Sequence, residues 1–162
     1  MAYLYFPKEL AIRIHDKIIS ISGGHTGIKD LGNIESPLYH IQNDDYYPYL
    51  EDKLTHLVFC FNKFHAFNDG NKRTSIALGA FFLQVNGLGN FVNKFIIEME
   101  NVAVAVADNI IDKELLFEII TSIVYEDDYN EVLKIKIFDA LDKANRDIDP
   151  DLYENNVFWG LY

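Results

Sequence analysis

Apolar residues recur at helical spacing along nearly all of this 162-residue chain, and this pattern constrains the fold more than any other feature. Turn-forming residues gather at only a few places, around residues 23–27, 43–48 and 86–87. The spacing between them predicts helices over residues 7–22, 33–41, 49–64, 71–85, 94–109, 112–125 and 130–145. The sequence therefore predicts an all-α fold.

Two of these helices carry more specific expectations. In the first, the spacing places on one buried stripe Leu10, Ile14, Ile18 and Ile21. Residues 94–109 contain alternating Val and Ala, and the β-branched residues leave a strand open as an alternative. We favour a buried helix there, because the apolar run is long.

Charge and hydropathy exclude several classes of function. The net charge is -11 and the isoelectric point is near 4.7, so the surface repels phosphate backbones and anionic lipids. No apolar stretch approaches the roughly 20 residues of a membrane span. The lone Cys60 lies among apolar residues and is expected to be a small buried hydrophobe. We expect a cytoplasmic protein that binds neither nucleic acid nor membrane directly.

Residues 65–73 gather groups that suit the handling of phosphate. Gly70 and Asn71 stand at a predicted helix start, where unpaired N–H groups and the helix dipole favour an anion. Lys72 and Arg73 add positive charge there, which disfavours a helix N-terminus unless an anion binds. Spacing alone leaves open a plain polar loop that precedes a helix.

The same loop offers a base and a metal ligand. His65 has a ring suited to taking a proton from a hydroxyl near neutral pH, and Asp69 is a hard oxygen ligand suited to Mg²⁺. Phe67 stands between these polar residues and is expected to point into the core. Together these residues form a minimal set for moving a phosphoryl or nucleotidyl group.

Residues 65–73 resemble the Fic/Doc (Fido) family motif H-x-F-x-D/E-G-N-G/K-R and match it at every specified position. The resemblance extends to the glycine-rich residues 23–36 and to Asn86-Gly87, and covers roughly residues 7–125. It implies a bundle of about six helices with the motif between two central ones. It also implies a domain over residues 1–126, followed by an added C-terminal helix within residues 127–162.

The resemblance also implies roles for the motif residues and a pair of cofactors, ATP and Mg²⁺. His65 would be the general base that deprotonates a Ser, Thr or Tyr hydroxyl of a target protein. Asp69 would hold Mg²⁺. The nucleotide phosphates would be bound by Gly70, Asn71, Lys72 and Arg73.

Two departures from the AMP-transferring members favour the death-on-curing branch. Lys72 replaces a common Gly, and Ile76 stands where those enzymes carry a second Arg. Similarity to that branch implies a phosphotransferase toxin of a toxin–antitoxin system, with a translation factor as one candidate target and a small antitoxin as partner. AMP transfer and a non-catalytic Fic-fold binding module stay open as alternatives.

Three further segments leave choices open. Residues 23–32 form either a flap that positions a target, with His25, Thr26 and Lys29 along a cleft, or a plain flexible linker. Glu126 loosely resembles the family's inhibitory Glu, but Ile76 removes its partner, so we expect an ordinary helix-end charge.

The extension beyond residue 126 has an apolar stripe and an aromatic end. The stripe comprises Leu133, Ile137 and Leu141, and the end comprises Phe158, Trp159 and Tyr162. These side chains are expected to pack on the domain's own core. A dimer interface or an antitoxin-binding surface are the alternatives.

Overall fold

The structure is a computed structural model that describes residues 2–148. Over these residues the chain forms α1 Lys8–Ser22, α2 Gly32–His40, α3 Leu50–Lys63, α4 Asn71–Val85, η1 Gly89–Phe91 (a 3-10 helix), α5 Val92–Ala107, α6 Lys113–Tyr125 and α7 Glu131–Ile148. The all-α prediction is confirmed, and the helix bounds agree with the predicted ones to within about three residues, a difference usual for helix ends.

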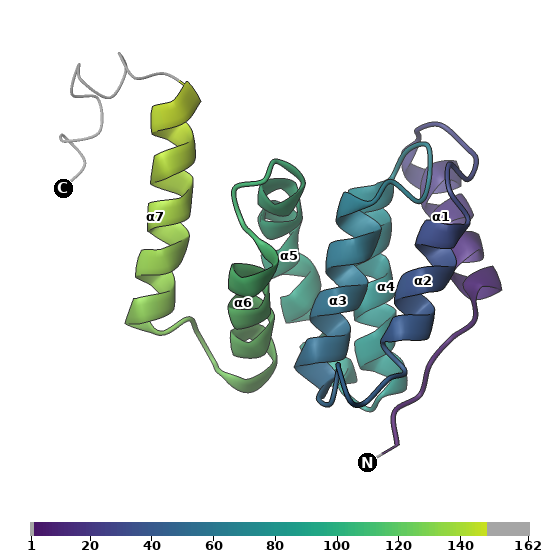
Figure 1. Ribbon diagram of the computed structural model, residues 1–162, viewed down its shortest axis with the longest axis horizontal. Helices are drawn as coiled ribbons and strands as arrows, with labels where there is room; N and C mark the ends of the chain where they lie inside the picture. Colours follow the sequence, from purple (N-terminus) through teal and green to yellow (C-terminus); the bar gives the residue numbers. More distant parts are fainter. Residues whose placement is uncertain (1, 149–162) are drawn as a thin grey trace.

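Helix α3 is the centre of the bundle, where it packs against α2, α4, α5 and α6 (Figure 1). Helix α1 packs on α2 and α4 at one side, and α7 packs on α6 at the other. The loop between α3 and α4 lies at one end of the bundle, and α6 finishes at the opposite end. The motif therefore lies between the two helices that pack most extensively.

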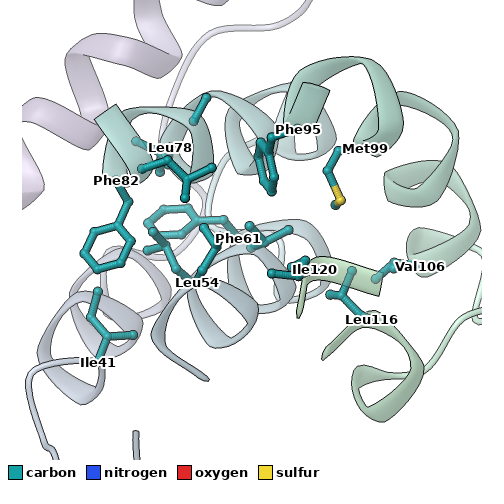
Figure 2. Packing of buried hydrophobic residues seen from close by; sticks show 14 of the residues in the cluster. Ile41, Leu54, Phe61, Leu78, Phe82, Phe95, Met99, Val106, Leu116 and Ile120 are labelled. Atoms are coloured by element: carbon teal, nitrogen blue, oxygen red, sulfur yellow. The ribbon is translucent and has the colours of Figure 1, made fainter. Parts of the chain in front are cut away.

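The core fills the space between α3, α4, α5 and α6 (Figure 2). Its large, fully buried side chains include Leu54, Phe61, Leu78, Phe82, Phe95, Met99, Leu116 and Ile120. Gly79 allows α4 to approach its neighbours closely, because a Cβ there would stand 2.7 Å from Phe95 Cζ and 2.9 Å from Val58 Cγ2. This packing holds the start of α4, and hence the motif, in a fixed place.

The predicted stripe on the first helix is wrong by one position. The buried residues of α1 are Ala11, His15 and Ile19. Ile21, which we expected inside, is 75% exposed, and Leu10, Ile14 and Ile18 are only half-buried. The sequence misleads here because the buried face carries a small residue and a polar one beside Ile19, whereas most of the aliphatic side chains flank it.

Residues 94–107 lie in helix α5, so the strand alternative is wrong. In α7, Leu133 is buried and Ile137 half-buried, but Leu141 is 42% exposed, so the expected inward stripe ends early. The aromatic residues Phe158, Trp159 and Tyr162 lie outside the described residues, and the boundary at residue 126 stays a prediction. Across residues 2–148, every helix is too short or too polar to cross a bilayer.

Candidate functional site

The motif loop turns sharply twice between α3 and α4. Gly70 precedes the first residue of α4 with a φ of 76°, a left-handed conformation that glycine adopts without strain. His65, which follows the C-terminal cap of α3, has a φ of 49°, uncommon for a residue with a Cβ. Backbone strain of this kind is often found at functional sites.

The side chain of Asn71 closes the loop on itself. Its Oδ1 accepts a hydrogen bond from Phe67 N at 3.0 Å, and its Nδ2 donates to Phe67 O at 2.9 Å. Phe67 is 1% exposed and anchors the loop in the core, as predicted. The Asn71 carboxamide is thus occupied within the loop, so any anion contact of this residue falls to its backbone N–H at the helix start.

The glycine-rich segment before α2 is fastened to the motif loop through backbone hydrogen bonds. Lys29 N donates to Ala66 O at 2.9 Å, Asn68 N donates to Gly27 O at 3.1 Å, and Ile28 forms an antiparallel bridge with Phe67. The side chain of Asn68 adds a bond to Thr26 O at 3.0 Å. This segment is therefore paired with the motif and does not run free as a linker.

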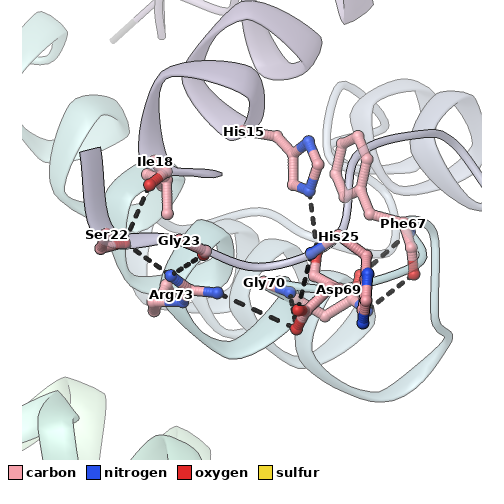
Figure 3. Close-up of polar contacts among 10 residues, drawn as sticks. His15, Ile18, Ser22, Gly23, His25, Phe67, Asp69, Gly70 and Arg73 are labelled. Carbon is pink, nitrogen blue, oxygen red and sulfur yellow. Dashed lines mark hydrogen bonds and ion pairs between the residues drawn. The ribbon is translucent and has the colours of Figure 1, made fainter. Parts of the chain in front are cut away.

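Asp69 is ionised and held in place by backbone N–H groups (Figure 3). His25 N donates to its Oδ2 at 3.0 Å, and Gly70 N donates to its Oδ1 at 2.7 Å. These bonds, first that from His25, with a smaller contribution from the charge of Arg73, hold the pKa of Asp69 below its ordinary value. The carboxylate therefore keeps its negative charge at neutral pH.

Arg73 joins the start of α4 to the end of α1. Its guanidinium donates to Ser22 Oγ and, at 2.8 Å, to Gly23 O, and one nitrogen lies 3.9 Å from Asp69 Oδ1 (Figure 3). The carbonyl end of α1 carries partial negative charge, which stabilises a cation there. The fold thus holds this charge beside α4, where the helix dipole alone would disfavour it.

A cavity of about 370 Å³ opens over the motif loop. It is lined by Asn62, His65, Asn68, Asp69, Gly70, Asn71, Lys72, Arg73 and Ala107. The last of these belongs to the C-terminal end of α5, which is tied to α3 because Asn62 Nδ2 donates to Ala103 O at 2.8 Å. Every predicted site residue therefore lines one cavity: His65, Asp69, Gly70, Asn71, Lys72 and Arg73.

Two other polar residues lie away from this cavity's lining. His56 is 8% exposed and accepts a hydrogen bond from Lys113 Nζ at 2.8 Å, so it is a satisfied structural histidine. The Glu126 carboxylate accepts a hydrogen bond from Ser122 Oγ at 2.7 Å, at the end of the bundle opposite the motif. The Glu126 contact agrees with the helix-end charge expected from sequence.

Two histidines outside the motif contact it, and sequence reasoning missed the first and expected a different contact from the second. His15, buried on α1, places its Nε2 2.7 Å from Asp69 O, and His25 bonds the Asp69 carboxylate through its backbone rather than its ring. Neither has a motif spacing of its own. The only signal for His15 was its position four residues from Ala11 and Ile19, which sequence did not identify as a buried face.

Comparison with known proteins places this geometry in a family. The sequence model of the Fic/DOC family matches residues 5–83. The chain is also 37% identical over 89 residues to the protein named protein kinase doc of Escherichia phage P1, an alignment that covers 52% of this chain and 69% of that protein. Residues 5–83 contain the glycine-rich segment, the motif loop and nearly all of α4.

Proposed function

Because this chain belongs to the Fic/DOC family, we propose that it transfers the γ-phosphate of ATP to a Ser, Thr or Tyr hydroxyl of a target protein. One observation carries the proposal: a base, a carboxylate and two cations line a single cavity at the N-terminus of α4. Transfer of a phosphoryl group requires little covalent chemistry from the protein, so catalysis depends almost entirely on positioning and charge.

In the proposed reaction His65 takes the proton from the acceptor hydroxyl. The acceptor oxygen then forms a bond to the γ-phosphorus, and the bond from that phosphorus to the β–γ bridging oxygen breaks, releasing ADP. The His65 side chain is exposed at the cavity, where an acceptor residue from another protein can reach it. General-base catalysis of this kind contributes about 10²- to 10⁴-fold to a rate.

The phosphates would be held by the start of α4. The first N–H groups of a helix have no carbonyl four residues back, so they are available to an anion. Lys72 is exposed beside them, and Arg73 is already fixed by Gly23 O. Donors fixed before the substrate arrives stabilise developing charge without reorganising.

The donor set also fits a magnesium ion that arrives with the nucleotide. Of the described residues that line the cavity, only Asp69 carries a carboxylate. Mg²⁺ commonly takes one or two carboxylates together with substrate phosphates and waters, so one ionised Asp69 is enough. When bound there, the ion would neutralise charge on the phosphate oxygens. Asp69 itself is held ready by His25 N and Gly70 N.

Phosphoryl transfer is favoured over AMP transfer by two residues and one relative. Lys72 adds bulk and charge to the phosphate region, and Ile76 packs against the core, where AMP-transferring members have a second Arg. The similar phage protein is named a protein kinase. We infer that the γ-phosphorus, not the α-phosphorus, faces the acceptor hydroxyl.

Two radiolabels distinguish the reactions. The protein is incubated with cell extract, Mg²⁺ and ATP labelled on either the γ- or the α-phosphate, with His65→Ala as the control. We expect γ-label on a protein band that His65→Ala does not produce. Transfer of α-label would establish an AMP transferase instead, and transfer of neither label would overturn the enzymatic proposal.

We further propose that the chain acts as the toxin of a toxin–antitoxin pair, with a translation factor as target and a small protein as antitoxin. The support is similarity to the phage protein kinase. Expression of the wild type should arrest growth and protein synthesis, whereas His65→Ala should permit both. Growth arrest by both forms would instead favour a non-catalytic binding module.

A further inference from the structure

A buried histidine from α1 contacts the motif loop and lies outside the cavity's lining (Figure 3). His15 is 0% exposed, and its ring stacks on Phe67 with centroids 3.7 Å apart and planes 3° from parallel. Its Nε2 lies 2.7 Å from Asp69 O, and its Nδ1 lies 3.2 Å from Asp16 Oδ1. A carbonyl oxygen can only accept, so Nε2 carries the hydrogen in this contact.

This contact fixes the direction of one peptide plane. In a trans peptide the C=O and the N–H point to opposite sides, so a carbonyl of Asp69 aimed at α1 sends the N–H of Gly70 the other way. The N–H of Gly70 does point to Asp69 Oδ1, at 2.7 Å, and both residues line the cavity. His15 thus determines that the N–H of this peptide, and not its C=O, faces the proposed phosphate site.

Gly70 makes such a constraint necessary. Rotation of the Asp69–Gly70 peptide by half a turn would carry the φ of Gly70 from 76° to a negative value, and glycine tolerates both. The rotated peptide would withdraw the N–H from the carboxylate of Asp69. It would also turn a carbonyl oxygen, a negative pole, toward the side on which anions are expected to bind.

We propose that His15 is a positioning residue that locks the Asp69–Gly70 peptide with its N–H toward the cavity, and so shapes the site for nucleotide phosphates. This inference rests on the proposed function for its consequence, but its geometry can be tested without nucleotide. His15 acts through Asp69 and Gly70, which contact the cavity, and does not line the cavity itself.

Two substitutions separate the hydrogen bond from the packing. His15→Phe keeps an aromatic ring to stack on Phe67 but removes the donor. His15→Gln removes the ring but keeps an N–H near the position of Nε2. His56→Phe is the matched control, because His56 is also a buried histidine but bonds to Lys113 rather than to the loop.

The first measurement is NMR of the Gly70 amide in the free protein. We expect His15→Phe to move its proton shift upfield and to speed its exchange with solvent several-fold. His15→Gln should restore both properties, and His56→Phe should leave both unchanged. An unchanged Gly70 amide in a folded His15→Phe protein would overturn the inference, whatever the protein does with ATP.

The second measurement is calorimetric titration with ATP and Mg²⁺. We expect His15→Phe to weaken binding about tenfold, the cost of one misplaced hydrogen-bonding group, with recovery in His15→Gln. A purely structural His15 would lower the melting temperature in both variants without this split between them, and that result counts against the inference. Failure of the wild type to bind ATP would instead overturn the proposed function, while the Gly70 amide still decides the role of His15.

Discussion

The motif loop and the surroundings of His56 are two clusters of polar groups in the same bundle, and they differ in where their polar groups point. In the loop, His65, Lys72 and the first N–H groups of α4 face a cavity of about 370 Å³. Around His56, Lys113 donates to the ring at 2.8 Å, and its ammonium lies 5.7 Å from the ring centroids of Tyr47 and Phe59. In this second cluster the polar groups therefore interact with their own neighbours.

Burial makes the histidine and the cysteine of the second cluster unreactive. It lowers the pKa of His56 to about 4 and raises that of the neighbouring Cys60 to about 11, so at pH 7 the imidazole and the thiol are both neutral. A thiol in that state is a poor nucleophile. A histidine and a cysteine within hydrogen-bond reach are thus no indication of catalysis when both are buried and neutral.

The largest effect that this comparison predicts is on transfer of label from ATP. His65→Ala should reduce transfer by about 10²- to 10⁴-fold, since it removes the proposed base. It should leave thermal unfolding nearly unchanged, because the side chain is exposed. His56→Phe should have the opposite profile, with a lower melting temperature and transfer within about twofold of wild type per folded molecule. Comparable loss of transfer in both variants would erase the distinction between the clusters.

The next effect concerns the side chain that closes the loop. Asn71→Ala should destabilise the fold by about 2 kcal/mol, because two hydrogen bonds to Phe67 are lost, and should reduce transfer by roughly a hundredfold as the phosphate site loosens. Urea unfolding and label transfer measure the two consequences.

Asn130→Ala is the control for stability alone. Asn130 accepts a hydrogen bond from Leu133 N at the start of α7, and loss of such a cap costs about 1 kcal/mol. Its transfer rate should match wild type. If Asn71→Ala retained full transfer despite its lower stability, the closed loop would not be needed for the site.

Helix positions could be predicted because their signals are local. Asp112, which caps α6 by accepting a bond from Leu115 N, and Asn86-Gly87 after α4 stand beside the helix ends they define. The motif residues could be grouped for the same reason, since they lie within one short stretch of chain. His15 could not, because only packing of α1 against α4 brings it to Asp69. The buried face of α1 was predicted wrongly for a similar reason, since the hydrophobic pattern favours Ile18 over His15 as a buried residue.

A third prediction uses pH to separate the clusters. The pKa of His56 falls from 6.5 in an unfolded chain to about 4 in the fold, chiefly because burial penalises its charge. Between these values the unfolded chain binds a proton that the folded one does not, so stability falls as pH drops through this window. After allowance for solvent screening the loss is about 2 kcal/mol at pH 4.5 relative to pH 7.

Urea unfolding of wild type and His56→Phe at both pH values measures this loss. Carboxylates that titrate in the same range are common to both proteins, so they cancel in the difference. We expect His56→Phe to lose about 2 kcal/mol less than wild type over this interval. Equal losses would mean that His56 is not held neutral by its surroundings.

The smallest effect is expected at Glu126, which resembles an inhibitory residue in sequence but not in position. Its carboxylate accepts from Ser122 Oγ, and Lys94 donates to its carbonyl oxygen at 2.6 Å, so both ends of the residue are engaged at the end of the bundle opposite the motif. Glu126→Gln should therefore change transfer by less than about twofold, because a charge at the opposite end of the bundle from the motif is largely screened at ordinary ionic strength. Glu118→Gln, which loses a pair with Lys136, is the matched surface control. A large rise in transfer confined to Glu126→Gln would show that this carboxylate restrains the site. Because the fold keeps Glu126 away from the cavity of its own chain, the restraint would then have to come from a second copy.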